Sequence, residues 1–148
     1  MLGLLQRVSS ARVVVDDQQV AAIDKGLLVL IGVERGDTEA QADRLLDRLL
    51  GYRVFADDAN KMNLSITDVG GGLLLVPQFT LPANTNKGMR PSFSPAAEPA
   101  TGERLFDHLV ARAREKYSPV EAGRFGASMS VTLTNHGPVT FMLRAGAD

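Results

Sequence analysis

The sequence predicts a mixed α+β fold of the α/β class. We expect a single compact domain over residues 1–148, with two main helices and mixed, largely antiparallel sheets in β/β/α layers, because 148 residues suit one domain. Many short apolar runs separated by turn residues are typical of strands. Two longer segments place their apolar residues on one helical face only, and a one-sided helix must bury that face against a sheet.

Three apolar runs predict the first strands. Residues 2–8 and 11–15 are predicted as two separate strands, and residues 27–33 as a third, which follows Gly26. The third run is apolar almost without interruption, which indicates burial on both of its faces.

The clearest helix is predicted to begin at Thr38. Thr38 and Gln41 have the spacing of a capping box, and Gly51 is predicted to end the helix. A short strand at residues 52–55 and a polar turn at residues 57–61 are expected next. The apolar stripe of the helix consists of Ala42, Leu45, Leu46, Leu49 and Leu50.

A glycine turn at residues 70–72 is predicted to lead into an apolar strand at residues 73–76. The proline-rich residues 82–99 are predicted as a long loop, and loops of this length in compact domains are usually functional or disordered. Proline is favoured in the first helical turn, so the second helix is predicted to begin near Pro99 and to stop before Pro119.

Strict alternation predicts a strand near the end of the chain, with Met129, Val131 and Leu133 on one face. Asn135-His136-Gly137-Pro138 is predicted as a turn, and residues 139–143 as the closing strand. The sequence leaves the Gly137–Pro138 bond open between cis and trans.

Composition excludes several kinds of chemistry. The chain has no cysteine, which rules out cysteine nucleophiles and disulfides, and its two histidines are too few for a transition-metal site, so we expect no metal and no cofactor. The net charge of −1 indicates that any nucleic-acid contact is local. No apolar run reaches the roughly 18 residues of a membrane span, and the first residues look like a strand, so a cytoplasmic protein without a membrane partner is expected.

Two polar segments are candidates for chemistry. Gln78-Phe79-Thr80 follows an apolar strand that Pro77 is expected to end or bend. His136 and Thr80 suggest a base and a nucleophile, with Asp107 or Asp68 as the orienting acid, but no spacing establishes this arrangement. The pattern alone favours the plainer interpretations, a strand end and a hairpin turn.

These two segments resemble paired signatures of the bacterial and eukaryotic D-aminoacyl-tRNA deacylases. Residues 77–81 are similar to a Ser-Gln-Phe-Thr-Leu type motif, with Pro77 in the place of the usual serine, and residues 135–140 are similar to an Asn-x-Gly-Pro-Val-Thr type motif, with His136 at its variable position. Five further segments follow the family order: Gln6-Arg7-Val8, Gly26-Leu27-Leu28-Val29-Leu30, Lys61-Met62-Asn63-Leu64-Ser65, Gly88-Met89-Arg90-Pro91-Ser92-Phe93 and Gly123-Arg124-Phe125-Gly126-Ala127.

The resemblance implies a hydrolase that cleaves the ester of D-aminoacyl-tRNA and of glycyl-tRNA mischarged on tRNA-Ala. It implies a homodimer in which Gly137 and Pro138 of one subunit enter the other subunit's pocket. Their carbonyls would hold the substrate's α-amino group, so that an L side chain strikes the protein. Arg7 and Met129 are assigned to substrate binding, and Met129 would share the pocket of the terminal adenosine with Phe79.

The resemblance assigns catalysis to Gln78, Phe79 and Thr80 and leaves two mechanisms open. Thr80 attacks the ester, or the protein positions the ester while the tRNA 2′-hydroxyl assists water; the second is favoured because Thr80 has no evident base. The expected partners are aminoacyl-tRNA and a second copy of the chain, without DNA. The alternatives are an editing deacylase for L-alanine, a non-catalytic module that binds the tRNA 3′ end, and a hydrolase of free D-amino acid esters.

Overall fold

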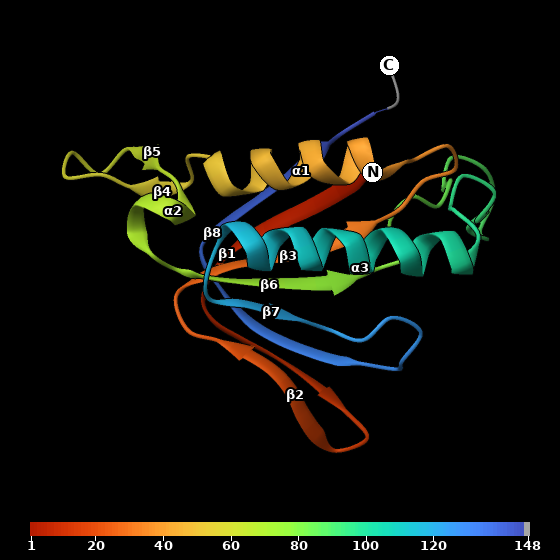
Figure 1. Cartoon of the computed structure of the whole chain (residues 1–148), viewed down its shortest axis with the longest axis horizontal. Helices are drawn as coiled ribbons and strands as arrows, with labels where there is room; N and C mark the ends of the chain where they lie inside the picture. Colours follow the sequence, from red (N-terminus) through yellow and green to blue (C-terminus); the bar gives the residue numbers. More distant parts are fainter. Residues whose placement is uncertain (147–148) are drawn as a thin grey trace.

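A six-stranded sheet with two long helices on one face forms the body of the protein (Figure 1). The computed structural model describes residues 1–146. In chain order the elements are β1 (Leu2–Val15), β2 (Gln18–Ile23), β3 (Gly26–Gly32), α1 (Glu39–Gly51), β4 (Phe55–Ala56), β5 (Met62–Leu64), α2 (Ile66–Val69), β6 (Gly72–Pro77), α3 (Pro99–Lys116), β7 (Val120–Ala122) and β8 (Ser130–Arg144).

The strand β1 organises the sheet, because it pairs with three others. Its first half pairs with β3 and its second half with β2, while β8 follows almost its whole length on the other side. All three pairings are antiparallel, whereas β3, β6 and β7 pair in parallel. The sheet order is β2-β1-β3-β6-β7, with β8 on β1. The predicted mixed, largely antiparallel α+β fold is confirmed.

Three strand predictions are wrong. The predicted strand at residues 52–55 overlaps the observed β4, Phe55–Ala56, at Phe55 alone. The predicted strands at residues 2–8 and 11–15 are a single strand, because β8 pairs with β1 from Leu2 to Val14 and the ladder only shifts its register, between Gln6 and Val8 and between Val8 and Ser10. The predicted turn at residues 135–138 is instead a bulge within β8. Gln6 pairs with Thr140 and Val8 with Asn135, so Arg7 alone lies opposite the intervening residues.

The structure confirms where the two predicted helices, α1 and α3, begin. The Thr38 side chain accepts a hydrogen bond from the Ala40 amide, and the Gln41 side chain accepts one from the Thr38 amide, as in a capping box. Proline occupies the first turn of α3, where its missing N–H costs nothing. The sequence did not predict the short elements β2, β5, α2 and β7, which lack a long apolar pattern.

Buried side chains form one cluster on each face of the sheet. The larger cluster lies between the sheet and helices α1 and α3. The second lies on the opposite face, where the far half of β1 and the whole of β2 fold over β3 and β6 (Figure 1). The two β layers are therefore parts of one strongly bent sheet. Leu27 and Leu28 belong to different clusters, which confirms that β3 is buried on both faces.

Within residues 1–146, no helix combines the length and apolarity that a membrane crossing requires.

Candidate active site

A cavity of about 450 Å³ lies at the carboxyl ends of the parallel strands β3 and β6. This end of a parallel pair is where ligands commonly bind in α/β sheets. No charged side chain lines the cavity, and Gln78 contributes the only polar side chain among the described residues. The walls are Ile31, Val33, Val76, Pro77, Gln78, Phe79, Ala96, Ala97, Pro99, Gly102, Phe106, Phe125, Gly126, Ala127, Met129 and Val131.

Two glycines allow the far wall of the cavity to pack closely. An added Cβ at Gly102 of α3 would lie 3.3 Å from the Phe125 ring, and one at Gly123 would lie 2.9 Å from the Met129 sulfur. The Arg124 amide also approaches that sulfur, at 3.4 Å. Phe125 and Met129 can therefore pack directly against the backbone of these glycines, where no side chain stands in the way.

The segment after β6 forms the near wall. The Gln78 amide donates to the Ile31 carbonyl at 2.8 Å, which continues the strand ladder past Pro77. The chain then turns, and the Leu81 amide donates to the Gln78 carbonyl at 3.1 Å. The Gln78 side-chain amide donates to the Thr80 hydroxyl. The Phe79 ring is 63% exposed and contacts the Phe93 ring at a centroid distance of 5.5 Å.

The structure brings some of the predicted site residues together. Gln78, Phe79 and Met129 line one cavity, and Thr80 is the next residue in the chain after Phe79. Within one chain the hypothesis of a His136–Thr80 pair is wrong, because His136 lines a different cavity. Asp68 caps α2 instead, where its carboxylate accepts from the Ser65 amide and this bond lowers the pKa of Asp68. Asp107 is exposed on α3.

The second cavity, of about 390 Å³, lies beside the bulge of β8 and includes Arg7, Lys25, Phe55 and His136. The Arg7 guanidinium donates through Nε to the His136 carbonyl at 2.9 Å and through Nη1 to the Val54 carbonyl at 2.7 Å. Arg7 therefore ties the bulge to the chain that follows α1.

Gly137 and Pro138 form an exposed corner at the tip of the bulge. The bond between them is cis. Asn135 braces the corner, because its side chain accepts from the Val139 amide at 2.7 Å and donates to the Thr140 hydroxyl at 2.8 Å. Gly137 has a φ of +138°, and an added Cβ would lie 2.7 Å from the Val139 side chain. This position accepts only glycine without rearrangement.

The corner and the cavity are far apart within one chain. Arg7, beside the corner, is level with Leu27 of β3 and Leu73 of β6, whereas Thr80 lies past the other end of β6. The steps from β8 through β1 and β3 to β6 add about 14 Å across the sheet, at about 4.8 Å per strand. One chain therefore cannot place Gly137 and Pro138 against its own Thr80.

Sequence reasoning missed Asn135 as the brace of the corner, and Phe93 and Phe106 as neighbours of the site. Phe93 stood within a family-like segment, which was a usable signal. Phe106 had no such signal, because a phenylalanine in a helical stripe is usually read as core.

Fold and site together define a small α+β protein with an uncharged cavity at its strand ends and, at a distance, a glycine–proline corner braced by Asn135. The chain belongs to the D-Tyr-tRNA(Tyr) deacylase family, whose model matches residues 4–144. This match confirms the membership expected from the motifs, and the family is one of enzymes.

Curated relatives are similar in sequence to this chain over nearly their whole length. The D-aminoacyl-tRNA deacylase of Thioalkalivibrio sulfidiphilus (strain HL-EbGR7) is 65% identical, covering 97% of this chain and 96% of the relative. The protein of the same name from Stutzerimonas stutzeri (strain A1501) is 61% identical, covering 98% and 100%.

Two solved structures share the fold. The c-Myc DNA Unwinding Element Binding Protein is 35% identical, with a TM-score of 0.94 and coverage of 99% of this chain and 100% of that one. A probable eukaryotic D-amino acid tRNA deacylase has a TM-score of 0.79 with coverage of 96% and 97%, and its identity of 18% shows the fold alone.

Proposed function

We propose that this protein hydrolyses the ester of D-aminoacyl-tRNA and releases the free D-amino acid and tRNA. One observation carries the proposal: Gln78, Phe79 and Met129, from separate parts of the chain, line one uncharged cavity beside Thr80. Its volume suits a nucleoside, and adenine and ribose need no counter-charge. The terminal adenosine occupies this cavity, and its aminoacyl ester lies toward Thr80.

We infer that the working enzyme is a homodimer in which each subunit's corner completes the other's site. The distance between corner and cavity within one chain supports this inference, because only a second copy can bring them together. In the assembled site, main-chain carbonyls at Gly137 and Pro138 accept hydrogen bonds from the substrate's α-ammonium group. A D side chain then points to open space and an L side chain strikes the corner, which is selection by exclusion. Glycine has no side chain, so glycyl-tRNA, including that mischarged on tRNA-Ala, is also a substrate.

Catalysis on this arrangement depends on positioning. Among the described residues, the amides of Phe79 and Thr80 have no intramolecular acceptor, whereas the flanking amides of Gln78 and Leu81 do. Two adjacent unpaired N–H groups can stabilise the oxyanion of the tetrahedral intermediate, a contribution of about 2.7–4 kcal/mol per donor in enzymes where it has been measured. The 2′-hydroxyl of the terminal ribose assists the attacking water.

Thr80→Ala is expected to keep kcat within about tenfold of the native value, because a positioning hydroxyl without a base contributes less than the about 10²–10⁴-fold typical of acid–base catalysis. Single-turnover hydrolysis of D-tyrosyl-tRNA measures this, with Thr80→Ser as the matched control. A drop of several orders of magnitude, together with an acyl-enzyme trapped from the native protein by acid quench, would make Thr80 a nucleophile.

The function itself is tested by D-tyrosyl-, L-tyrosyl- and glycyl-tRNA at equal enzyme concentration. We expect hydrolysis of the D-tyrosyl and glycyl esters and none of the L-tyrosyl ester. Hydrolysis of L-alanyl-tRNA but not D-tyrosyl-tRNA would indicate an editing deacylase for L-alanine. Tight binding without turnover would indicate a tRNA-end module, and equal rates on free D-tyrosine esters would indicate a small-molecule esterase. A duplex DNA competitor that leaves the rates unchanged separates the protein from a DNA-binding function.

A further inference from the structure

The uncharged cavity cannot by itself hold the end of a tRNA. Each nucleotide before the terminal adenosine brings one phosphate charge, and the cavity offers these phosphates no cation. The protein's net charge of −1 provides no general attraction for a polyanion. Within this chain, contact with these phosphates therefore requires cations on the segments that border the cavity.

The loop that follows the cavity wall carries such cations. Residues 77–97 contain Lys87 and Arg90 but no aspartate or glutamate. Across residues 1–146, neither Lys87 nor Arg90 forms an ion pair or a side-chain hydrogen bond. Arg124, beside the cavity residue Phe125, is likewise without an acidic partner among the described residues.

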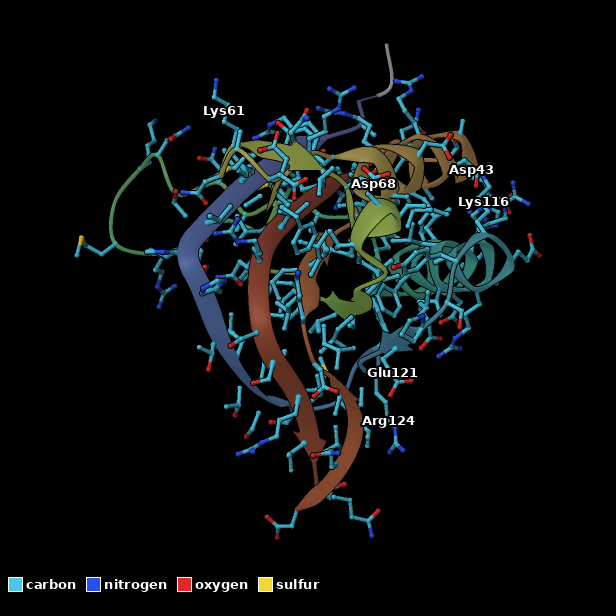
Figure 2. The ribbon with its side chains drawn as sticks, turned by 90° about the vertical axis from the view of Figure 1, so that its left-hand side faces the viewer. Asp43, Lys61, Asp68, Lys116, Glu121 and Arg124 are labelled. Carbon is cyan, nitrogen blue, oxygen red and sulfur yellow. The ribbon has the colours of Figure 1, made fainter. Side chains whose placement is uncertain are left out.

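Three basic side chains of α3 are different, because acids neutralise them: Arg104, Arg112 and Lys116. Lys116 lies 3.0 Å from Asp47 and Arg112 lies 2.8 Å from Glu115, and Figure 2 shows Lys116 beside the face that carries Asp43. At the cavity end, the carboxylates of Glu34 and Asp37 pair with the amino group of Met1. Three acids that adjoin cavity residues in the sequence, Glu98, Glu103 and Asp107, have no such partner among the described residues, but they belong to α3 or its N-cap. The segment 77–97 itself carries only positive charge.

The loop is held in place at its base. Asn84 and Ser92 exchange two backbone hydrogen bonds of 2.8 and 2.9 Å. The Phe93 ring packs on Phe79, and the Arg35 side chain donates to the Ser94 carbonyl. The tip between these anchors is open to solvent, and Met89 is 100% exposed. Figure 1 shows the loop beyond the arrowhead of β6, at the end of the molecule where the cavity lies.

We propose that Lys87 and Arg90 bind the phosphodiester groups of the nucleotides that precede the terminal adenosine. This inference rests on the proposed function and adds a second contact to it. The cavity holds the uncharged nucleoside, and the loop tip holds the charged backbone upstream. Each phosphate contact on a single strand releases bound counterions. The logarithm of the binding constant therefore falls with log[salt] with a slope of about −0.7 per contact, for two contacts here.

The double variant Lys87→Gln/Arg90→Gln tests this proposal. We expect KM for D-tyrosyl-tRNA to rise about tenfold near 0.15 M salt, with kcat unchanged, and the slope of log(kcat/KM) against log[salt] to become shallower by about 1.4. For D-tyrosyl-adenosine, which has no upstream phosphate, the native enzyme and the variant should have equal kcat/KM.

A matched control is Lys61→Gln/Arg114→Gln, which removes the same charge. Lys61 lies in the β4–β5 turn and Arg114 in the last turn of α3, both at the opposite end of the molecule (Figure 1). Equal KM and equal salt slopes for the two double variants would overturn the phosphate contact. Failure of the native enzyme on both substrates would instead overturn the proposed function, so the two failures are distinguishable.

Discussion

Gly137→Ala is expected to lower kcat/KM for D-tyrosyl-tRNA by about 10²-fold or more, because displacing a positioned group by about 1 Å costs that much. The added Cβ would lie 2.7 Å from the Val139 side chain and 3.1 Å from Nη2 of Arg7. Both neighbours belong to the arrangement that holds the corner, so the carbonyls must move. Steady-state kinetics on D-tyrosyl- and glycyl-tRNA measure the loss.

Gly70→Ala controls for backbone strain in this experiment. Gly70 also has a positive φ, of +68°, but nothing lies within 4 Å of its added Cβ, and it caps the remote helix α2. Alanine at Gly70 carries the left-handed penalty of about 1–2 kcal/mol without a steric clash, and the Gly70 variant should retain native kinetics. Native kinetics in the Gly137 variant would remove the corner from the mechanism.

The same variant tests whether the corner acts across subunits. Gly137→Ala subunits can be mixed with subunits whose cavity is blocked by Ala97→Trp. In a mixed twofold dimer, one site combines an intact cavity with the partner's intact corner, so random mixing restores about a quarter of the native rate. No recovery in dimers shown to have exchanged subunits would place the corner's action within its own chain.

Gly26→Ala is expected to destabilise the protein by about 3 kcal/mol or more, since overpacking a core contact that cannot relax has costs at or above this level. The added Cβ would lie 1.9 Å from the Gly72 carbonyl oxygen and 2.6 Å from the Gly72 nitrogen. Both atoms are backbone at the point where β3 and β6 begin to pair, so neither can rotate away. Urea unfolding measures the change as a lower midpoint or a loss of cooperative folding.

Gly51→Ala is the matched control for the folding experiment. Gly51 ends α1, and nothing lies within 4 Å of its added Cβ. Alanine there should stabilise the helix by about 0.5–1 kcal/mol, because glycine loses more backbone entropy on folding. An unchanged urea midpoint for Gly26→Ala would show that β3 and β6 can move apart at this point without loss of stability. That result would contradict the prediction.

Local patterns predicted the elements whose causes are local. The Thr38–Gln41 capping box and the proline at the start of α3 act within one turn, so the sequence placed both helix starts correctly. The alternation at residues 129–133 likewise appears as alternating burial in the structure. Errors arose where pairing between distant strands overrode the local signal, as in the unbroken β1 and the strand that continues through Gly137 and Pro138.

By itself, the sequence determined the two long helices, most of the apolar strand segments and the family, because capping, periodicity and motif order are properties of neighbouring residues. Only the tertiary structure decided which of the candidate residues meet. It joined Gln78 and Phe79 with Met129 in one cavity, and it separated His136 from Thr80. The physical reason is that strand register and sheet bending depend on hydrogen bonds between residues far apart in the chain, and no local pattern specifies these bonds.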